Sequence, residues 1–179
     1  MALKSYDEVV QFHGHSCPGL AMGYRMASAA LEVLGEKHST DEELVAIVEN
    51  NACGVDALQY LSGCTFGKGN LIFKDYGKHV YTLYDRRSRN GVRVLFRVEN
   101  LPSELRGDRE ELLQWILSAP QEQVIRLEEV VIEEPPPARI MKSVMCDFCG
   151  EAVMETRIIE IDGKRACIPC AGKRGKFNG

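Results

Sequence analysis

The feature that most constrains this chain is a pair of Cys-x2-Cys motifs separated by 17 residues, at Cys146, Cys149, Cys167 and Cys170. Zinc prefers four tetrahedral ligands, and thiolates meet that preference in structural sites. The segment between the motifs is strand-like over 153–161 and has a turn signal at 162–163, so a hairpin would bring the second pair back to the first. About 40 residues bury too little apolar surface to fold alone, so the metal would supply folding energy. We therefore predict a structural zinc site in a treble-clef or ribbon-like module.

The sequence leaves the role of this module open. The same cysteine pattern is compatible with a redox dithiol pair or an iron-bound rubredoxin-like site. Its basic side chains could contact a phosphate backbone, although a solvated basic face is the commoner explanation. They are Lys164, Arg165, Lys173, Arg174 and Lys176. The net charge of -4 gives no global sign of nucleic-acid binding, so nucleic acid is not the expected partner but stays open.

Charge divides the chain near the triproline at 135–137. Residues 1–137 carry 14 Lys and Arg against 21 Asp and Glu, whereas residues 138–179 carry 8 against 5. A proline run is a stiff, extended linker. We therefore predict a core domain over 1–134, a linker over 135–141 and a zinc-binding module over 142–179.

The sequence predicts a cytoplasmic protein. No apolar run approaches the roughly 20 residues that a membrane span needs, and the N-terminus lacks the basic-then-apolar pattern of a signal peptide. In a reducing compartment, the seven cysteines are better explained as metal ligands or reactive thiols than as disulfides. We expect no membrane partner.

The core sequence mixes helical periodicity with short alternating runs. The spacing of apolar residues predicts helices over 18–34, 54–62 and 109–117. Strands are predicted over 44–49, 71–73, 79–84, 92–98 and 124–132, with a hairpin signal at Asn90-Gly91. Without a regular βαβ repeat, this order favours an α+β fold with a mainly antiparallel sheet and packed helices.

The segment before the first of these helices combines two histidines with a cysteine. Pro18 suits the first helical position, which places Cys17 at the N-cap, where the helix dipole favours a thiolate. In an extended segment, residues two apart point to the same side, so His13, His15 and Cys17 would face together and a metal could bridge the last two. The alternative for the cysteine is a buried, small apolar role.

Two further cysteines flank the helix over 54–62. Nine helical residues span about 14 Å, so Cys53 and Cys64 cannot share one ion unless the helix is shorter or bent. Cys53, at the helix start, is therefore the better candidate. We predict a core metal site of His15, Cys17 and Cys53, with His13 or Cys64 as an optional further ligand, and Cys17 as the candidate catalytic thiolate.

A glycine-rich loop follows this helix, over 63–70. It resembles a phosphate loop in composition but lacks the required residue order, and a strand follows where a helix is needed, so nucleotide hydrolysis is rejected. Lys68 near a thiolate could form an anion site. A flexible turn with a solvated lysine explains the loop equally well.

Three ordered blocks of sequence resemble the E-subunit family of formylmethanofuran dehydrogenase. The blocks span 12–25, 53–59 and 63–71, so the resemblance covers roughly residues 5–135. The cysteine module is similar to an extension found in a subset of that family. The residues that fall on family-pattern positions are His15, Cys17, Cys53, Asp56, Gln59, Cys64 and Lys68.

The resemblance implies an α+β core that dimerises, with a cleft around Cys17. The named enzyme is a multi-subunit molybdenum or tungsten system, and the family's name records association with it without establishing catalysis. The substrate is therefore not carried over. The resemblance leaves redox-enzyme subunits as possible partners.

These observations support three hypotheses about function. The first is a metal- and thiol-containing protein of redox or one-carbon metabolism, with zinc in the tail and zinc or another transition metal in the core. Asp56 and Gln59, one helical turn apart, would orient a ligand or water there, with Lys68 as a further ligand-binding residue. The second is a non-catalytic accessory subunit or adaptor that docks through its zinc finger. The third is a metal-sensing, nucleic-acid-binding regulator.

Overall fold

A computed structural model describes residues 4–35 and 38–173 of the chain. The chain divides into two compact units, Met1–Ala138 and Arg139–Gly179, which we call the core unit and the zinc module. The boundary between the units falls inside the proline-rich segment that the sequence indicates as a linker. None of the described helices is long and apolar enough to cross a membrane.

The core unit is built on a five-stranded sheet with the order β2-β1-β3-β4-β5. Only β1 and β2 pair in parallel, and the other neighbours are antiparallel. The strands are β1 (Leu44–Val48), β2 (Leu71–Phe73), β3 (Val80–Asp85), β4 (Asn90–Phe96) and β5 (Ile125–Val130). The predicted α+β class with a mainly antiparallel sheet is confirmed.

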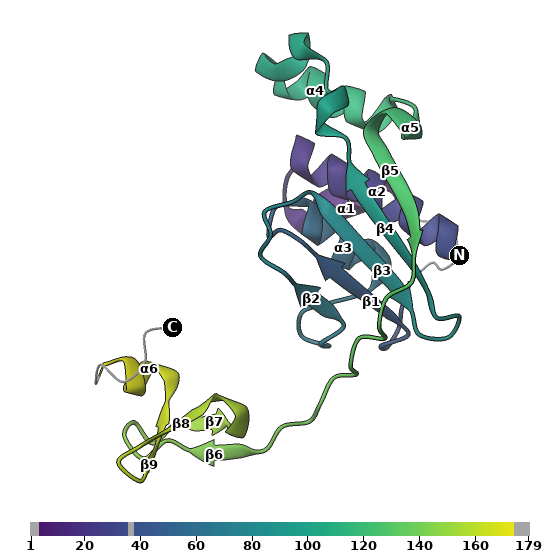
Figure 1. The fold of residues 1–179 in the computed structure, drawn as a ribbon. Coiled ribbons are helices and arrows are strands. Elements are labelled where there is room, and N and C mark those ends of the chain that lie inside the picture. Colours follow the sequence, from purple (N-terminus) through teal and green to yellow (C-terminus); the bar gives the residue numbers. More distant parts are fainter. Residues whose placement is uncertain (1–3, 36–37, 174–179) are drawn as a thin grey trace. The chain divides into compact units, whose positions relative to one another are not determined.

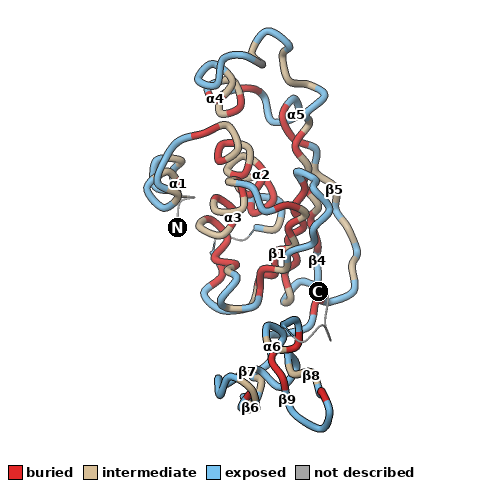
Figure 2. The backbone as a smooth tube through the Cα atoms, turned by 90° about the vertical axis from the view of Figure 1, so that its left-hand side faces the viewer, coloured by how far each residue is buried: buried red, intermediate tan, exposed pale blue. Residues whose placement is uncertain are grey.

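Helices cover one face of this sheet, as Figures 1 and 2 show from two directions. They are α1 (Tyr6–His13), α2 (Pro18–Leu34) and α3 (Gly54–Ser62). Two further helices, α4 (Arg109–Ser118) and α5 (Gln121–Val124), lie between β4 and β5 in the chain. The predicted bounds of α2 and α3 agree with the structure.

Helix α1 is one of the elements that the hydrophobic pattern did not predict. It begins with a capping box, in which the Ser5 hydroxyl accepts from the Glu8 N–H and the Glu8 carboxylate accepts from the Ser5 N–H. It ends at His13, so the expectation of an extended segment at His13 was wrong. Gly14, with φ of 96°, then supplies the left-handed turn that leads toward α2.

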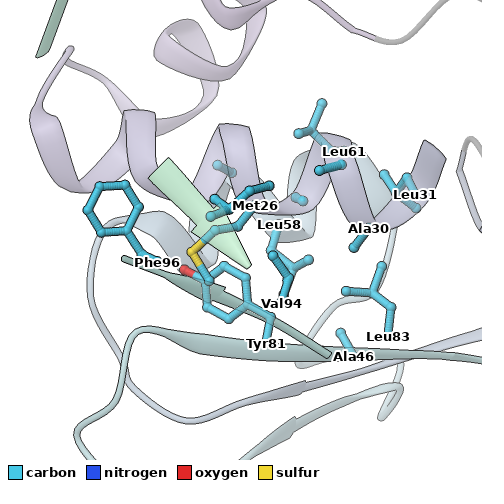
Figure 3. Close-up of a cluster of buried hydrophobic side chains, with 14 of the residues drawn as sticks. Met26, Ala30, Leu31, Ala46, Leu58, Leu61, Tyr81, Leu83, Val94 and Phe96 are labelled. Carbon is cyan, nitrogen blue, oxygen red and sulfur yellow. The ribbon is translucent and has the colours of Figure 1, made fainter. Parts of the chain in front are cut away.

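The hydrophobic core lies between α2, α3 and the helix-facing side of the sheet. Figure 3 shows Met26, Ala30 and Leu31 opposite sheet residues such as Leu83 and Val94. The side chains of Leu31, Leu58 and Leu83 have no exposed surface. Burying such side chains stabilises the fold by about 1.5–3 kcal/mol each relative to leaving them exposed.

Helices α2 and α3 approach closely because glycines stand where they cross. A Cβ atom on Gly23 would lie 2.2 Å from the carbonyl oxygen of Gly54. A Cβ atom on Gly54 would lie 2.5 Å from the Tyr81 hydroxyl. This contact holds together the N-terminal ends of both helices, where Cys17 and Cys53 are the N-cap residues.

Arg25 ties α2 to the C-terminal end of α4. Its guanidinium donates to the carbonyl oxygens of Ile116 at 2.8 Å, Leu117 at 2.7 Å and Ala119 at 2.8 Å. These carbonyls belong to the last turn of α4 or follow it, where no intrahelical N–H group is left to donate to them. One part-buried cation therefore caps a neighbouring helix, and burial lowers its pKa from the ordinary arginine value.

The zinc module consists of two short hairpins and a short helix. Its elements are β6 (Ser143–Met145), β7 (Ala152–Met154), β8 (Ile158–Ile161), β9 (Lys164–Cys167) and α6 (Ile168–Gly172). The strand expected over 153–161 is interrupted by a 3-10 turn at Glu155–Arg157, so it forms two strands that pair with different partners. The predicted turn at 162–163 connects β8 to β9.

Candidate metal centres

The four cysteines of the zinc module converge on one point. Their sulfur atoms lie within 4.8 Å of one another. Cys146 and Cys149 follow β6 on one knuckle, whereas Cys167 ends β9 and Cys170 lies in α6. Four thiols at this spacing fit a tetrahedral zinc site, so the sequence prediction of the tail site fits the structure.

Backbone groups prepare one of these thiols for metal binding. N–H groups of Cys149, Cys167 and Phe148 lower the pKa of the Cys146 thiol to about 6. An ion pair between Arg165 and Asp147, at 2.9 Å, joins the first knuckle to β9. The first pair of cysteines is therefore held against the second by contacts other than the metal.

A second cluster lies between the end of α1 and the start of α2. The ligand atoms of His13, His15 and Cys17 lie within 4.8 Å of one another, and the two imidazole rings are 4.5 Å apart between centroids. The side chains meet because α1 ends at His13 and Gly14 reverses the chain direction. The histidines therefore come together through a helix end rather than through an extended segment.

Each member of this core cluster has a different environment. Cys17 is buried, and its sulfur accepts from the Leu20 N–H at 3.4 Å as the N-cap of α2. His15 is exposed, whereas the His13 side chain is only 10% exposed. A metal at this point would be held by buried groups on one side and reach solvent on the side of His15.

Asp56 fixes the orientation of His13. Its Oδ2 lies 2.6 Å from His13 Nδ1, so the carboxylate accepts the ring proton and leaves Nε2 as the atom available to a ligand. His13 Nε2 is buried and has no hydrogen-bond partner among the described residues. Gln59 supports Asp56 from the next turn of α3, donating to Asp56 Oδ1 at 3.4 Å.

The donor atoms of the core cluster are suited to binding a metal ion. Leaving a buried imidazole nitrogen unpaired costs free energy, and metal coordination would satisfy it. A carboxylate behind a histidine is the usual arrangement of groups around a metal-bound imidazole. Asp56 was expected to orient a ligand or water, but in the structure it contacts His13.

Cys53 adjoins the core cluster without belonging to the group of three. It precedes α3, and a Cβ atom on Gly19 of α2 would lie 3.5 Å from the Cys53 Cβ. Burial raises the pKa of the Cys53 thiol, and interaction with the Cys17 thiol raises it further. The structure therefore brings Cys53 close to Cys17, as a neighbour of the cluster.

Cys64 and Lys68 lie elsewhere. Cys64 is fully buried, its Sγ donates to the Leu44 carbonyl at 3.4 Å, and burial raises its pKa to about 11. Cys64 therefore has the buried, small apolar role that is usual for a free cysteine, and it belongs to neither group of potential ligands. Lys68 Nζ donates to the carbonyl oxygens of Ser39 at 3.3 Å and Asp41 at 3.2 Å.

Sequence reasoning missed Tyr81 beside the core cluster. This residue projects from β3 toward the start of α3, where only the absence of a side chain at Gly54 leaves room for its hydroxyl. Burial raises the Tyr81 pKa, and the nearby Asp56 and Cys53 act in the same direction. No local motif marks Tyr81, because it arrives through strand pairing across the sheet.

Comparison with known families decides the classification. A family model described as FmdE, molybdenum formylmethanofuran dehydrogenase operon, matches residues 12–134, which include the core cluster and the whole sheet. The chain belongs to the FmdE family. A second model, described as the prokaryotic dksA/traR C4-type zinc finger, matches residues 139–174. The resemblance seen in the three sequence blocks is thereby confirmed, together with the zinc-finger extension.

A solved structure agrees with this assignment, and a curated protein is also similar to this chain. The crystal structure of a tungsten formylmethanofuran dehydrogenase FmdE-like protein from Syntrophus aciditrophicus superposes with a TM-score of 0.69 at 27% identity, over 97% of this chain and 98% of that one. A protein of Archaeoglobus fulgidus named "Probable S-adenosyl-L-methionine-binding protein" is 33% identical over 190 residues. The match covers 90% of this chain but only 51% of that relative, so the chain spans about half its length.

Proposed function

We propose that this FmdE-family protein binds a transition metal in its core through His13, His15 and Cys17, in addition to zinc in its tail. The observation that carries the proposal is His13 Nε2, a buried nitrogen without a partner among the described residues, whose ring is oriented by Asp56. Imidazole and thiolate ligands together suit zinc, iron, copper or nickel rather than magnesium or calcium. The proposed setting for such a site is redox or one-carbon metabolism.

The role of Cys53 decides what the core metal does. Three protein ligands leave a fourth position open, as in catalytic zinc sites, whereas a fourth thiolate closes the site, as in structural ones. Cys53 adjoins Cys17 and could provide that fourth ligand. With the position open, the metal would offer a place for a substrate or water, and Cys17 would supply a thiolate ligand beside it.

Metal analysis tests the proposal. The purified protein should contain two metal equivalents per chain, and His13→Ala should lower the count to one while leaving tail zinc in place. Cys146→Ser should remove the other equivalent. His79→Ala is the matched control, because His79 is exposed and belongs to neither cluster. A single equivalent that is lost in Cys146→Ser and unaffected by His13→Ala would overturn the core site.

Binding of S-adenosylmethionine is a second candidate function. The observation that favours it is the name of the archaeal relative, whose match covers 90% of this chain. The half of that relative which this chain does not span is an equally good location for that activity. Equilibrium dialysis of this chain and of the longer relative with S-adenosylmethionine tests this candidate. Retention of the ligand by the longer relative alone would remove the candidate for the present chain.

A further inference from the structure

A cavity of about 440 Å³ lies beside the C-terminal half of α3. Helix α1 provides one wall, and the segments after α2 and after α3 provide others. Pockets of 300–1,000 Å³ suit small organic ligands. The residues that decide what this cavity can hold are Lys4, Phe12, Tyr60 and Lys68, with His38 and Thr65 beside them.

Two aromatic rings form an apolar wall of the cavity. Phe12 of α1 and Tyr60 of α3 contact each other with ring centroids 5.3 Å apart. Phe12 is nevertheless 54% exposed, which is high for a phenylalanine that has a packing partner. The exposed part of this wall can receive a flat apolar group from solvent.

Two ammonium groups face the same cavity, and among the described residues neither of them forms a salt bridge with a carboxylate. Lys4 Nζ donates to the Tyr60 carbonyl at 3.0 Å and lies 4.1 Å from the centre of the Tyr60 ring. Lys68 Nζ donates to the carbonyls of Ser39 and Asp41. Each ammonium has three donors, so both retain unused ones. In the part of the chain that the structure describes, the lining contains no carboxylate.

The C-terminal end of α3, which lies at the cavity, would not repel a bound anion. The last turn of an α-helix carries partial negative charge on free carbonyl groups. Here these carbonyls already have donors: Gly63 N–H for Gln59, Lys4 for Tyr60, His38 for Leu61 and Ser39 N–H for Ser62. The Glu43 carboxylate behind the wall is likewise engaged, by Ser39, Thr40 and the Asp41 N–H.

From these contacts we infer that the cavity is a binding site for a small organic anion, a carboxylate or phosphate carried on a flat apolar body. The anionic group pairs with Lys4 and Lys68, and the body lies against Phe12 and Tyr60. Gln59 also lines the cavity and donates to Asp56, so the bound ligand lies one residue from the carboxylate that orients His13. The inference does not depend on a metal in the core.

A series of probes with one ring and different charges tests this site. Benzoate, phenyl phosphate, benzamide and benzylamine share the phenyl group and carry charges from negative to positive. Titrations followed by amide NMR shifts should show the two anions binding more tightly than benzamide, with the shifts centred on residues around Phe12 and Tyr60. Benzylamine should not bind. The stronger of benzoate and phenyl phosphate identifies the source as carboxylate or phosphate.

Lysine variants separate charge from shape. Lys4→Met and Lys68→Met should each weaken binding of the preferred anion about fivefold, as loss of a partly exposed ion pair would. Benzamide binding should be unchanged, which shows that the cavity has kept its form. Lys74→Met is the matched control, because Lys74 is exposed and lies outside the cavity lining.

Three outcomes would overturn the inference. The first is benzylamine binding as tightly as benzoate. The second is anion binding that Lys4→Met and Lys68→Met leave unchanged. The third is no NMR shift around the cavity with any probe at concentrations on the order of 20 mM, where even a millimolar Kd would give near-saturation. Each is independent of metal content, so failure here and failure of the core metal site are distinguishable.

Discussion

At the scale of single residues, Asp56 is the position that most directly controls the proposed core site. It contacts neither His15 nor Cys17 through any described hydrogen bond, yet its Oδ2 lies 2.6 Å from His13 Nδ1. The carboxylate fixes the tautomer and the orientation of the ring, which leaves Nε2 as the atom that would bind the ion. Asp56 is therefore a positioning residue, and its effect should be visible in affinity rather than in folding.

We expect Asp56→Asn to weaken metal binding at the core site by about 10- to 100-fold, because the amide keeps a hydrogen bond to His13 but removes the charge. Competition with a chromophoric chelator measures this affinity, and thermal unfolding checks that the variant is folded. Asp75→Asn, at an exposed aspartate, serves as the control. Equal affinity in Asp56→Asn and the control would show that Asp56 has no role in metal binding.

The environment of Glu43 leads to a prediction about the stability of the core unit at low pH. The Ser39 hydroxyl, and then the Asp41 N–H, lower its pKa from 4.5 to about 2. Because the folded-state pKa is depressed, this stabilisation is complete above about pH 4.5 and is lost as the pH falls toward 2.

Glu43→Gln should therefore destabilise the core unit by about 1 kcal/mol near pH 7, a modest value because solvent screens this half-buried group. The difference from wild type should shrink as the pH falls from about 4.5 to about 2. Chemical denaturation across this range measures it, with Glu122→Gln at an exposed site as the control. A difference that is constant with pH would contradict the assignment.

At the scale of elements, the crossing of α2 and α3 positions the core cluster. Gly23 and Gly54 allow the two helices to touch, and their N-caps, Cys17 and Cys53, meet as a result. A side chain at this crossing would have to displace the backbone of a neighbouring helix, which cannot move as a flexible side chain can.

We expect Gly23→Ala to destabilise the core unit by about 1–3 kcal/mol, because its Cβ would lie 2.2 Å from the Gly54 carbonyl oxygen. Gly19→Ala is the matched control in the same helix, since its nearest contact, to the Cys53 Cβ, is an ordinary 3.5 Å. Urea denaturation measures both variants. Equal stability of the two would show that the crossing tolerates a methyl group.

Some helices and strands could be predicted from the sequence, and others could not. Periodicity and caps predict α2, α3 and the sheet strands because each carries a strong local signal. Helix α1 was not predicted because its eight residues are too few for a clear helical periodicity, although Ser5 and Glu8 form its capping box. The position of Tyr81 beside the core cluster could not be predicted from the sequence, because it depends on which strands pair in the sheet.

The core cluster illustrates the same limit. Local spacing is enough to bring His13, His15 and Cys17 together, although the reason given for it was an extended segment and the structure has a helix end. The contact between His13 and Asp56 joins residues 43 positions apart, so no local pattern contains it. The four tail cysteines were predictable because their spacing alone defines a zinc knuckle pair.

At the scale of the whole molecule, the two units differ in what holds them together. The core unit has a continuous apolar core across α2, α3 and the sheet. The buried apolar residues that form the core of the zinc module are Ile161, Ala166 and Ala171. So small a core cannot offset the entropy of ordering the module, and metal must supply the remainder.

Removal of tail zinc should therefore unfold the zinc module and leave the core unit folded. Limited proteolysis after chelation should cleave within residues 139–179 and leave a resistant fragment ending near Ala138. Cys146→Ser should behave like the chelated protein, whereas Met145→Ser, at an exposed neighbour, should not. A zinc module that resists protease equally with and without metal would show that its fold does not require zinc.

Dimer formation stays a prediction from the family resemblance, and light scattering coupled to gel filtration checks it. The mass of one chain is 20.0 kDa, so a dimer is well separated from a monomer in such a measurement.

Anomalous X-ray diffraction, recorded above and below the absorption edge of the bound metal, would show whether the core cluster holds a metal ion. We expect two peaks per chain: one among the four tail cysteines, and one about 2.0–2.3 Å from His13 Nε2 and Cys17 Sγ. A single peak in the tail, with His13 Nε2 hydrogen-bonded to protein or water instead, would contradict it.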